Sequence, residues 1–289
     1  MERADAAVWD VTRPRRPSRT AGVAMAGFRD RGRAAAGHRA VPHPAVSLAV
    51  ELGAGPLIVD DAAGRGRRGS VAAGLGFGSG GMRVRGENFE AVQVRLSPLV
   101  AHAILGVSPA ELDGAAVALG DLWGTEASRI AERMAAAASW EDRFALMDAF
   151  LARRRATGSP VAPEVARAWN RIVAGRGLVR VEELAAEAGW SRKRLWSRFH
   201  AQIGLPPKRA ARLVRFDHAA HLLAAGRDPA RVAAETGYAD QPHLHRDVVA
   251  FTGATPGTVA GEPWLAVDDI AWPARTAPPR PTRAPASGT

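Results

Sequence analysis

A seven-residue phrase occurs twice in the second half of this 289-residue chain. The first copy, LAAEAGW, runs from Leu184 to Trp190, and the second, VAAETGY, runs from Val232 to Tyr238. The copies align without a gap, and each ends in a glycine followed by an aromatic residue. Alanines before a glycine are typical of a helix that packs closely against a neighbour and ends in a left-handed turn. The repeat therefore predicts two copies of one helical unit.

In the first unit, each side of the turn has the pattern of a helix. Residues 181–188 form an amphipathic segment, and Gly189 supplies the turn. Ser191 is placed to cap the next helix, in which apolar residues recur at four-residue spacing, namely Leu195, Phe199 and Ile203.

The second unit has the same layout. Asp228 caps its first helix, with Pro229 at the first helical position. Gly237 then turns the chain, and Asp240 caps a helix over residues 241–251. A long helix over residues 206–226 joins the units, with an inward face formed by Leu213, Phe216, Ala220 and Leu223. Eighteen helical residues span roughly 27 Å, so this helix is long enough to hold two recognition helices about one DNA turn, roughly 34 Å, apart.

Two helices joined by a tight turn are the layout of a helix-turn-helix, whose second helix enters the DNA major groove. From Ser191 to Arg215 the sequence has eight Lys or Arg and no Asp or Glu. This local excess is more informative than the net charge of +10, because only Lys193 and Lys208 among the 39 basic residues are lysine. Arg and Ala richness of that kind is typical of a G+C-rich genome. Within a double helix-turn-helix, the local run indicates nucleic-acid contact.

The pattern changes along the chain and predicts an α+β protein. Residues 1–20 are basic and are expected to form a flexible arm. Residues 21–156 form a predicted N-terminal effector or dimerisation domain, β-rich to about 97 and helical over 98–156, where Ser108, Thr125 and Ser139 are placed to start helices. Residues 157–163 are predicted to form a linker, and residues 164–260 are predicted to form an all-α DNA-binding domain. The Pro-rich residues 273–289 are expected to be disordered.

Several classes of protein and site are excluded or disfavoured. Cysteine is absent, which excludes disulfides and thiolate sites. No apolar run approaches the roughly 20 residues of a membrane span, and the N-terminus lacks the apolar segment of a secretory signal, so a cytoplasmic protein without membrane association is expected. We expect no cofactor and no metal. The glycine-rich segment 73–81 precedes a strand-like segment, whereas a dinucleotide-binding loop precedes a helix. His218 and His221 lack a third metal ligand, and the acidic residues at 60–61 and 87–90 are expected to lie in loops.

Residues 165–260, a third of the chain, resemble the DNA-binding domain of the AraC/XylS family of bacterial transcription regulators. Five blocks carry the resemblance in family order: AAEAGWSRKRLWSRF, IGLPPK, RLVRFDHAAHLL, DPARVAAETGYADQPHLHR and FTGATP. The resemblance implies a transcriptional regulator that inserts two recognition helices into successive major grooves of promoter DNA.

The resemblance also implies contact residues. Base-reading positions correspond to Lys193, Trp196 and Ser197 in the first unit and to Pro242, His243 and Arg246 in the second. Arg246 is the strongest candidate, because arginine pairs bidentately with guanine. Phosphate contacts are expected from Arg192, Arg194, Arg198 and Arg212. The predicted DNA-binding set also includes Ser191, Gln241 and His245.

This chain departs from the family pattern mainly in the second unit. Pro242 stands where serine is usual, and Asp247 stands where an apolar residue is usual. Leu244 and Val248 replace large aromatic residues. These changes predict a less well packed core in the second unit and an acidic side chain beside the DNA. The second unit is therefore expected to bind DNA more weakly than the first. In the first unit Trp196 replaces an amide or small residue, so the family's base preference is not transferable.

The stretch RVRGENFEAVQVRLSPLVAHAILG resembles a module of some actinobacterial regulators of this family, for which no ligand is known. Two roles remain open: sensing a small-molecule effector through the apolar strand faces of Leu48, Val50, Val92 and Val94, or forming a homodimer. RNA polymerase is a further expected partner. Two alternative functions also remain open, a non-specific nucleic-acid binder and an enzyme fused to a DNA-binding domain. Against these, Tyr238 is the only tyrosine available for base stacking, and the nucleophilic cysteine of related repair regulators is absent.

Overall fold

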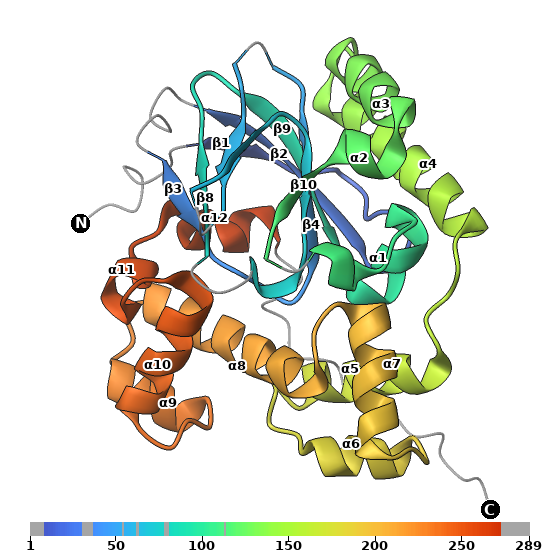
Figure 1. The fold of residues 1–289 in the computed structure, drawn as a ribbon. Helices are drawn as coiled ribbons and strands as arrows, with labels where there is room; N and C mark the ends of the chain where they lie inside the picture. The colour runs from blue at the N-terminus through green and yellow to red at the C-terminus, as the bar shows by residue number, and fades with distance from the viewer. Residues whose placement is uncertain are drawn as a thin grey trace, which may run out of the picture.

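The computed structural model describes residues 9–30, 37–53, 55–61, 64–77, 81–112 and 114–272. Its N-terminal part contains two antiparallel sheets packed face to face (Figure 1). The first sheet has the strand order β1-β2-β9-β4-β7-β10, and the second has the order β3-β8-β5-β6. The strands are β1 (Trp9–Thr12), β2 (Val23–Asp30), β3 (His38–Ala40), β4 (Val46–Glu51), β5 (Ile58–Asp60), β6 (Gly66–Arg68), β7 (Val71–Ala73), β8 (Met82–Arg85), β9 (Glu90–Leu96) and β10 (Ala116–Ala118).

The strands of the larger sheet alternate between two buried faces. Leu48 of β4 and Met25 of β2 are both in register with Val94 of the central strand β9. These three side chains lie on the face that contributes to the main apolar core. The residues between them, such as Ala49, Gln93 and Arg95, face the second sheet and the space between the sheets.

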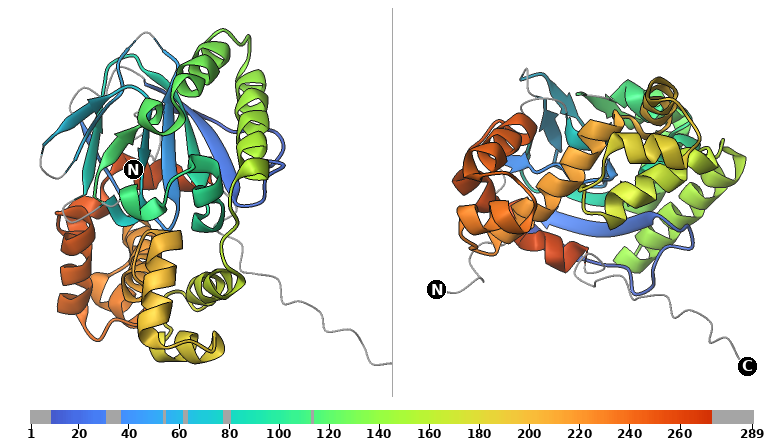
Figure 2. Two further views of the ribbon diagram at one scale, coloured as in Figure 1. Left: turned by 45° about the vertical axis from the view of Figure 1, so that its right-hand side comes forward. Right: turned by 90° about the horizontal axis from the view of Figure 1, so that it is seen from below.

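Four helices cover the outer face of the larger sheet, as Figure 2 shows. They are α1 (Pro98–Leu105), α2 (Leu119–Trp123), α3 (Thr125–Ala135) and α4 (Trp140–Thr157). Ser139 caps α4 by accepting from the Asp142 amide at 3.2 Å, as the sequence predicts. Thr125 is already the first residue of α3, and its N-cap is Gly124.

The predicted helix after Ser108 is largely wrong. Ser108 starts only a short 3-10 turn over Pro109–Leu112, where its hydroxyl accepts from the Ala110 amide at 3.2 Å. The chain then forms strand β10, which pairs with β7 at the edge of the larger sheet. Gly114, with a φ of +79°, marks the break, and the free edge of β7 supplies the backbone partners that favour a strand.

The predicted N-terminal arm is also partly wrong. Residues 9–12 form β1, which pairs with β2. Trp9 is buried and stacks on Trp264 with ring centroids 4.0 Å apart. Further along, Ser18 donates a hydrogen bond to Asp148 of α4. Residues 1–8 of the predicted arm lie outside the described residues, as does the predicted tail 273–289.

The C-terminal part is all helical: α5 (Pro163–Ala174), α6 (Val181–Glu187), α7 (Arg192–Ile203), α8 (Pro207–Ala224), α9 (Pro229–Glu235), α10 (Gln241–Thr252), α11 (Pro256–Ala260) and α12 (Pro263–Ala271). The inward face predicted for the long helix is the buried face of α8. Helix α12 was not predicted; it returns to the sheets and packs on β1 and β3. The α+β class with a β-rich N-terminal part is confirmed. Among the described residues, no helix is long and apolar enough to span a membrane.

Candidate nucleic-acid interface

The first repeated unit, which we call head 1, consists of α6, its turn and α7. Gly189 has a φ of +63°, and the Trp190 amide donates to the Ala185 carbonyl at 2.9 Å, which closes the turn. Ser191 accepts from the Arg194 amide at 3.2 Å and caps α7. Local sequence thus places α7 across α6 as predicted.

The second unit, head 2, consists of α9, its turn and α10. Gly237 has a φ of +74°, and the Tyr238 amide donates to the Ala233 carbonyl at 2.9 Å, the same closure as in head 1. Asp240 caps α10 by accepting from the His243 amide at 2.6 Å. Helix α10 starts one residue later than the repeat alone implies, because Ala239 is extra. Position by position, Arg246 in α10 therefore corresponds to Ser197 in α7.

The left-handed turns of both heads can be tested by replacing their glycines with alanine. A glycine inside a helix serves as the control, because alanine there should have the opposite effect on stability. Alanine at Gly189 or Gly237 is expected to cost about 1–2 kcal/mol of unfolding free energy, because a Cβ opposes a positive φ. At Gly237 the new Cβ would also meet Leu178, but that side chain is 57% exposed and can move. Gly257 lies in α11 with open space around its Cβ, so Gly257→Ala is expected to stabilise by about 0.5–1 kcal/mol. Urea unfolding of the three variants measures the difference, and equal signs would contradict the assigned turns.

The predicted contact residues of head 1 lie on the exposed face of α7. Leu195, Phe199 and Ile203 are fully buried toward α5, α6 and α8. The predicted contact residues of this head are exposed: Ser191, Arg192, Lys193, Arg194, Trp196, Ser197 and Arg198. Trp196 is 52% exposed and stacks on His200 with ring centroids 5.2 Å apart. This face is therefore free to enter a groove.

Some of these cations already have partners. Arg192 pairs with Glu182 at 3.1 Å, and both side chains are exposed. The Arg194 guanidinium lies 4.8 Å from the Trp190 ring centroid. Within the described part of the chain, Lys193 and Arg198 have no ion-pair partner. These two charges are the ones most available to phosphates.

Head 2 exposes most of its predicted set. Gln241, Pro242, His245 and Arg246 are exposed on α10. His243 is half-buried, with its ring edge-on to Tyr238 at 5.1 Å. The Nε of Arg246 donates to the Pro242 carbonyl of its own helix at 3.3 Å.

Asp247 is placed differently from the prediction. Its side chain is buried, and it turns away from the exposed face of α10 toward α8. Its two oxygens pair with Arg212 at 2.7 Å and Arg215 at 3.3 Å. The predicted acid beside the DNA is therefore a buried ion pair that ties α10 to α8. Arg212, predicted to contact phosphate, is half-buried in the same cluster.

Arg215 was missed by sequence reasoning. Its guanidinium lies 4.1 Å from the ring centroid of Tyr238 as well as beside Asp247. Burial, followed by the nearby Asp247 carboxylate, raises the pKa of the Tyr238 hydroxyl, so this ring stays neutral. The available signal was the three-residue spacing of Arg212 and Arg215, which places both on one face of α8.

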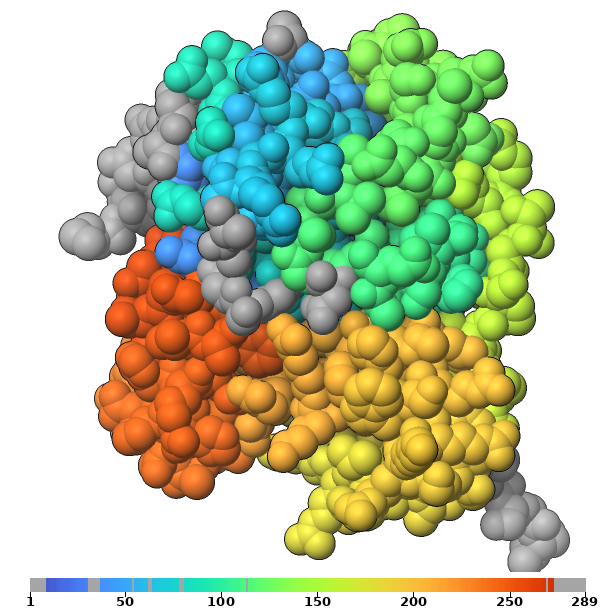
Figure 3. Space-filling view, in the orientation of Figure 1, coloured from blue at the N-terminus to red at the C-terminus, as the bar shows by residue number. Residues whose placement is uncertain are grey.

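The two heads form separate lobes below the β part, as Figure 3 shows. A groove lies between them, lined by α8, by the segment joining α5 to α6, and by α10. Its charged lining consists of Lys208, Arg212, Arg215, Arg246 and Asp247. Two exposed recognition helices on a shared linker helix, with a mainly basic groove between them, define a double helix-turn-helix DNA-binding protein.

Comparison with protein families agrees with this class. Residues 184–261 match the family described as "Helix-turn-helix domain". The C-terminal part of the chain is an AraC-type helix-turn-helix domain, and the chain is a DNA-binding transcriptional regulator. The resemblance read from the sequence is thus confirmed. A search of the curated proteins gives no match.

Among solved structures, ToxT from Vibrio cholerae O395 is similar with a TM-score of 0.46 and 8% identity, over 83% of this chain and 98% of ToxT. The C-terminal domain of AraT, a response regulator from Geobacillus stearothermophilus, gives 0.33 and 21%, over 35% of this chain and 87% of that one. The AraC-like transcriptional activator CuxR gives 0.32 and 13%, over 71% and 84%.

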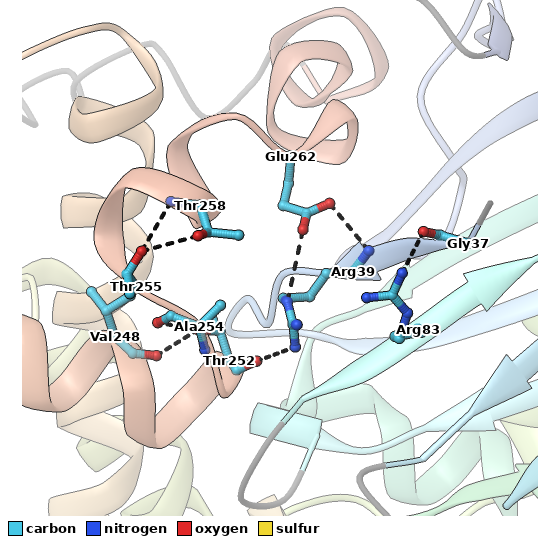
Figure 4. Close-up of polar contacts among 9 residues, drawn as sticks. All are labelled: Gly37, Arg39, Arg83, Val248, Thr252, Ala254, Thr255, Thr258 and Glu262. Carbon is cyan, nitrogen blue, oxygen red and sulfur yellow. Dashed lines mark hydrogen bonds and ion pairs between the residues drawn. The ribbon is translucent and has the colours of Figure 1, made fainter. Parts of the chain in front are cut away.

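The heads are not independent of the β part. Arg39 of β3 donates through Nη1 to the carbonyl of Thr252, the last residue of α10, at 2.5 Å (Figure 4). Its backbone amide donates to Glu262 at 3.1 Å, and its Nε lies 3.7 Å from the same carboxylate. Head 1 is held by the Ser108 hydroxyl, which donates to the Ala201 carbonyl of α7 at 2.6 Å. Both recognition helices therefore end against the N-terminal part.

The glycine-rich segment 73–81 takes part in this contact. Leu75–Phe77 form a 3-10 turn, and residues 78–80 lie outside the described residues. Gly81 lies so close to Thr252 that a Cβ would come within 2.9 Å of its carbonyl oxygen. Gly81, the last residue of this segment, thus lies against the end of α10.

A cavity lies between the two sheets and reaches α8 and α12. Its sheet residues include Ala49, Gln93 and Arg95, from the face opposite to the one predicted for sensing. Val50, Val92 and Val94 pack instead under the helices, and of the predicted four only Leu48 lines the cavity. Side chains along β4 and β9 do alternate between two faces of the sheet. Both faces are buried, so the alternation alone does not show which face borders the cavity.

His221 of α8 lines this cavity. Its Nε2 lies 2.8 Å from an oxygen of Asp268 on α12. In the part of the chain that the structure describes, no three His, Cys, Asp or Glu side chains are grouped to hold a metal ion.

Proposed function

We propose that this regulator inserts α7 and α10 into successive major grooves of promoter DNA and reads sequence with both. Base contacts are assigned to Lys193, Trp196 and Ser197 in head 1, and to Pro242, His243 and Arg246 in head 2. The observation that carries the proposal is the burial pattern: five of these residues are exposed on two equivalent capped helices and His243 is half-buried, while the apolar residues between them face inward.

Phosphate contacts are assigned to Arg192, Arg194 and Arg198, with Ser191, Gln241 and His245 at the borders of the reading faces. Among the described residues, no neighbouring carboxylate neutralises the charge of Arg198, or that of Lys193 in the base-reading set. Arg212 is assigned a different role from the one its position in the sequence predicts. Held by Asp247 at 2.7 Å, it positions α10 on α8 and has only part of its charge left for DNA.

Arg246→Ala tests the reading role of head 2. In vitro selection of bound duplexes by the full chain is expected to yield two short conserved blocks about 10 base pairs apart. Arg246→Ala should relax one position in one block and cost about 1–3 kcal/mol against the preferred duplex, since a bidentate contact to guanine is lost. Repeating the selection at two salt concentrations separates the loss of a base contact from the loss of a phosphate contact, because phosphate contacts depend on salt.

Arg198→Ala is the matched control, because it also removes one exposed arginine from a recognition helix. It should weaken binding to all duplexes alike and lower the salt dependence by about one phosphate contact. Suppose that the selected site has a single conserved block and that Arg246→Ala does not change it. Head 2 would then contact only the DNA backbone and read no bases. No enrichment, with binding that only fades as salt rises, would favour the non-specific binder.

We further propose that the cavity between the sheets binds a small-molecule effector that controls DNA binding. It is lined by both sheets and also by Asp217 and His221 of α8, the helix that carries both heads. A ligand there touches the effector part and the DNA-binding part at once. Homodimer formation, contact with RNA polymerase and a cytoplasmic location remain predictions from the sequence, and the proposal includes no catalytic step.

A further inference from the structure

We propose that the ligand of this cavity is a small, uncharged and mainly apolar molecule that carries one hydroxyl-type group. The inference rests on the proposed effector role of the cavity and names the class of effector. It comes from three features of the lining, namely the apolar walls, a floor of paired charges and two buried polar atoms without partners.

The walls of the cavity are apolar. Side chains from both sheets form them, among them Phe28, Leu57, Val59, Val71, Met82 and Val84. The cavity measures about 90 Å³, and an apolar cavity of about 150 Å³ takes up benzene. The space therefore limits the ligand to at most about one ring.

The floor of the cavity holds charges that neutralise one another. Arg95 of β9 binds Asp268 of α12 through both of its terminal nitrogens, at 2.5 and 3.3 Å. The His221 ring lies between two acceptors, with Nε2 at 2.8 Å from Asp268 and Nδ1 at 2.7 Å from the Asp217 carbonyl. A carbonyl oxygen only accepts, so Nδ1 donates to Asp217, while Nε2 and the Asp268 carboxylate share one proton between them. Arg95 and the His221 imidazole thus pair with the carboxylates of Asp217 and Asp268.

This balance disfavours a charged ligand. A carboxylate or ammonium group entering the cavity would find its natural partners already paired with one another. It would either stay unpaired among apolar walls or break a buried ion pair, and both are costly. An uncharged ligand avoids both costs.

The third feature calls for a polar group on that ligand. Gln93 and Trp264 both line the cavity. Within the described residues, Gln93 Oε1 and Trp264 Nε1 are buried and have no hydrogen-bond partner. Such atoms are rare in folded proteins because each loses its water without compensation. One lacks a donor and the other lacks an acceptor, and a hydroxyl can supply either.

The test compares four ring-sized probes on the full chain by isothermal titration calorimetry: phenol, toluene, benzoate and benzylamine. Phenol is expected to bind most tightly, about three- to tenfold more tightly than toluene for one added hydrogen bond. Benzoate and benzylamine are expected to bind more weakly than toluene. Gln93→Met and Trp264→Phe should each shrink the preference for phenol over toluene, measured as the ratio of the two dissociation constants of the same variant.

Trp272→Phe is the matched control. Trp272 is another tryptophan at the end of α12 whose buried Nε1 lacks a partner, but it does not line the cavity. This variant should keep the full preference for phenol. Loss of the preference in Trp272→Phe as well would show that α12 is merely disturbed and would overturn the assignment to Trp264.

The remaining outcomes separate this inference from the proposed function, because DNA affinity is measured on the same preparations. Tighter binding of benzoate or benzylamine overturns the ligand class and leaves an effector site in place. Equal binding of phenol and toluene overturns the hydroxyl requirement, and no binding of any probe overturns the cavity as a ligand site. Phenol that binds as expected but leaves DNA affinity unchanged supports the ligand class and contradicts effector control.

Discussion

Asp247→Ala is expected to lower the free energy of unfolding of the C-terminal part by about 3–5 kcal/mol, the usual cost of breaking a buried ion pair from one side. The alanine would leave Arg212 and Arg215 facing one another, and the Arg215 side chain is only 15% exposed. Head 2 would also lose its polar link to the linker helix. Urea unfolding of the full chain, followed by far-ultraviolet circular dichroism, measures the change.

Two variants serve as controls for this result. Replacing Asp247 by leucine together with Arg212→Met and Arg215→Met removes the whole cluster, and such replacements are often neutral or stabilising. Glu187→Ala breaks the exposed pair with Arg171 and should cost less than about 1 kcal/mol. A loss of under 1 kcal/mol for Asp247→Ala would show that the pair contributes no more than a surface contact.

Phe199→Ala is expected to have an effect of similar size on head 1, about 3–5 kcal/mol. The ring is fully buried between α7 and the helices around it, and its removal leaves a cavity lined by Leu195 and Ile203, among others. Because head 1 supplies one reading helix, binding to the selected duplex should weaken at temperatures where the unmodified head is still folded. Unfolding by urea and duplex binding together measure both effects.

Val248→Ala is the matched change in head 2, since Val248 is the equivalent position of α10 and is also fully buried. Two methyl groups are removed in place of a ring, so the expected cost is about 1–2 kcal/mol. The difference tests the prediction that the second core is the weaker one. Equal losses at the two positions would contradict it, and would mean that Phe251 makes up for the missing aromatic residue.

The DNA-binding heads could be predicted almost completely because their signals are short-range. Gly189 and Gly237 turn the chain, and Ser191 and Asp240 cap the helices that follow, through bonds to residues three positions away. Inward and outward residues of α7 follow from helical spacing alone. Such signals need no knowledge of the rest of the fold.

The N-terminal part could be predicted less completely, because its arrangement depends on contacts between distant segments. Alternation along β4 and β9 indicated strands correctly, but it gave no means of choosing between two buried faces. Residues 116–118 carry a helical pattern, and the free edge of β7 makes them a strand. Trp9, in a segment expected to be an arm, is buried because α12 brings Trp264 against it.

By itself, the sequence determined two capped helix-turn-helix units, the helix between them and the residues on their outward faces, since each depends on neighbours within one or two helical turns. Only the tertiary structure decided the roles of Asp247, Arg95 and His221. Asp247 meets Arg212 across 35 residues, and Arg95 meets Asp268 across 173. A charged residue on a helix gives no local sign of such a partner, because the pairing depends on how whole elements pack. The buried ion pair under head 2 and the balanced floor of the cavity therefore appear only once the chain is folded.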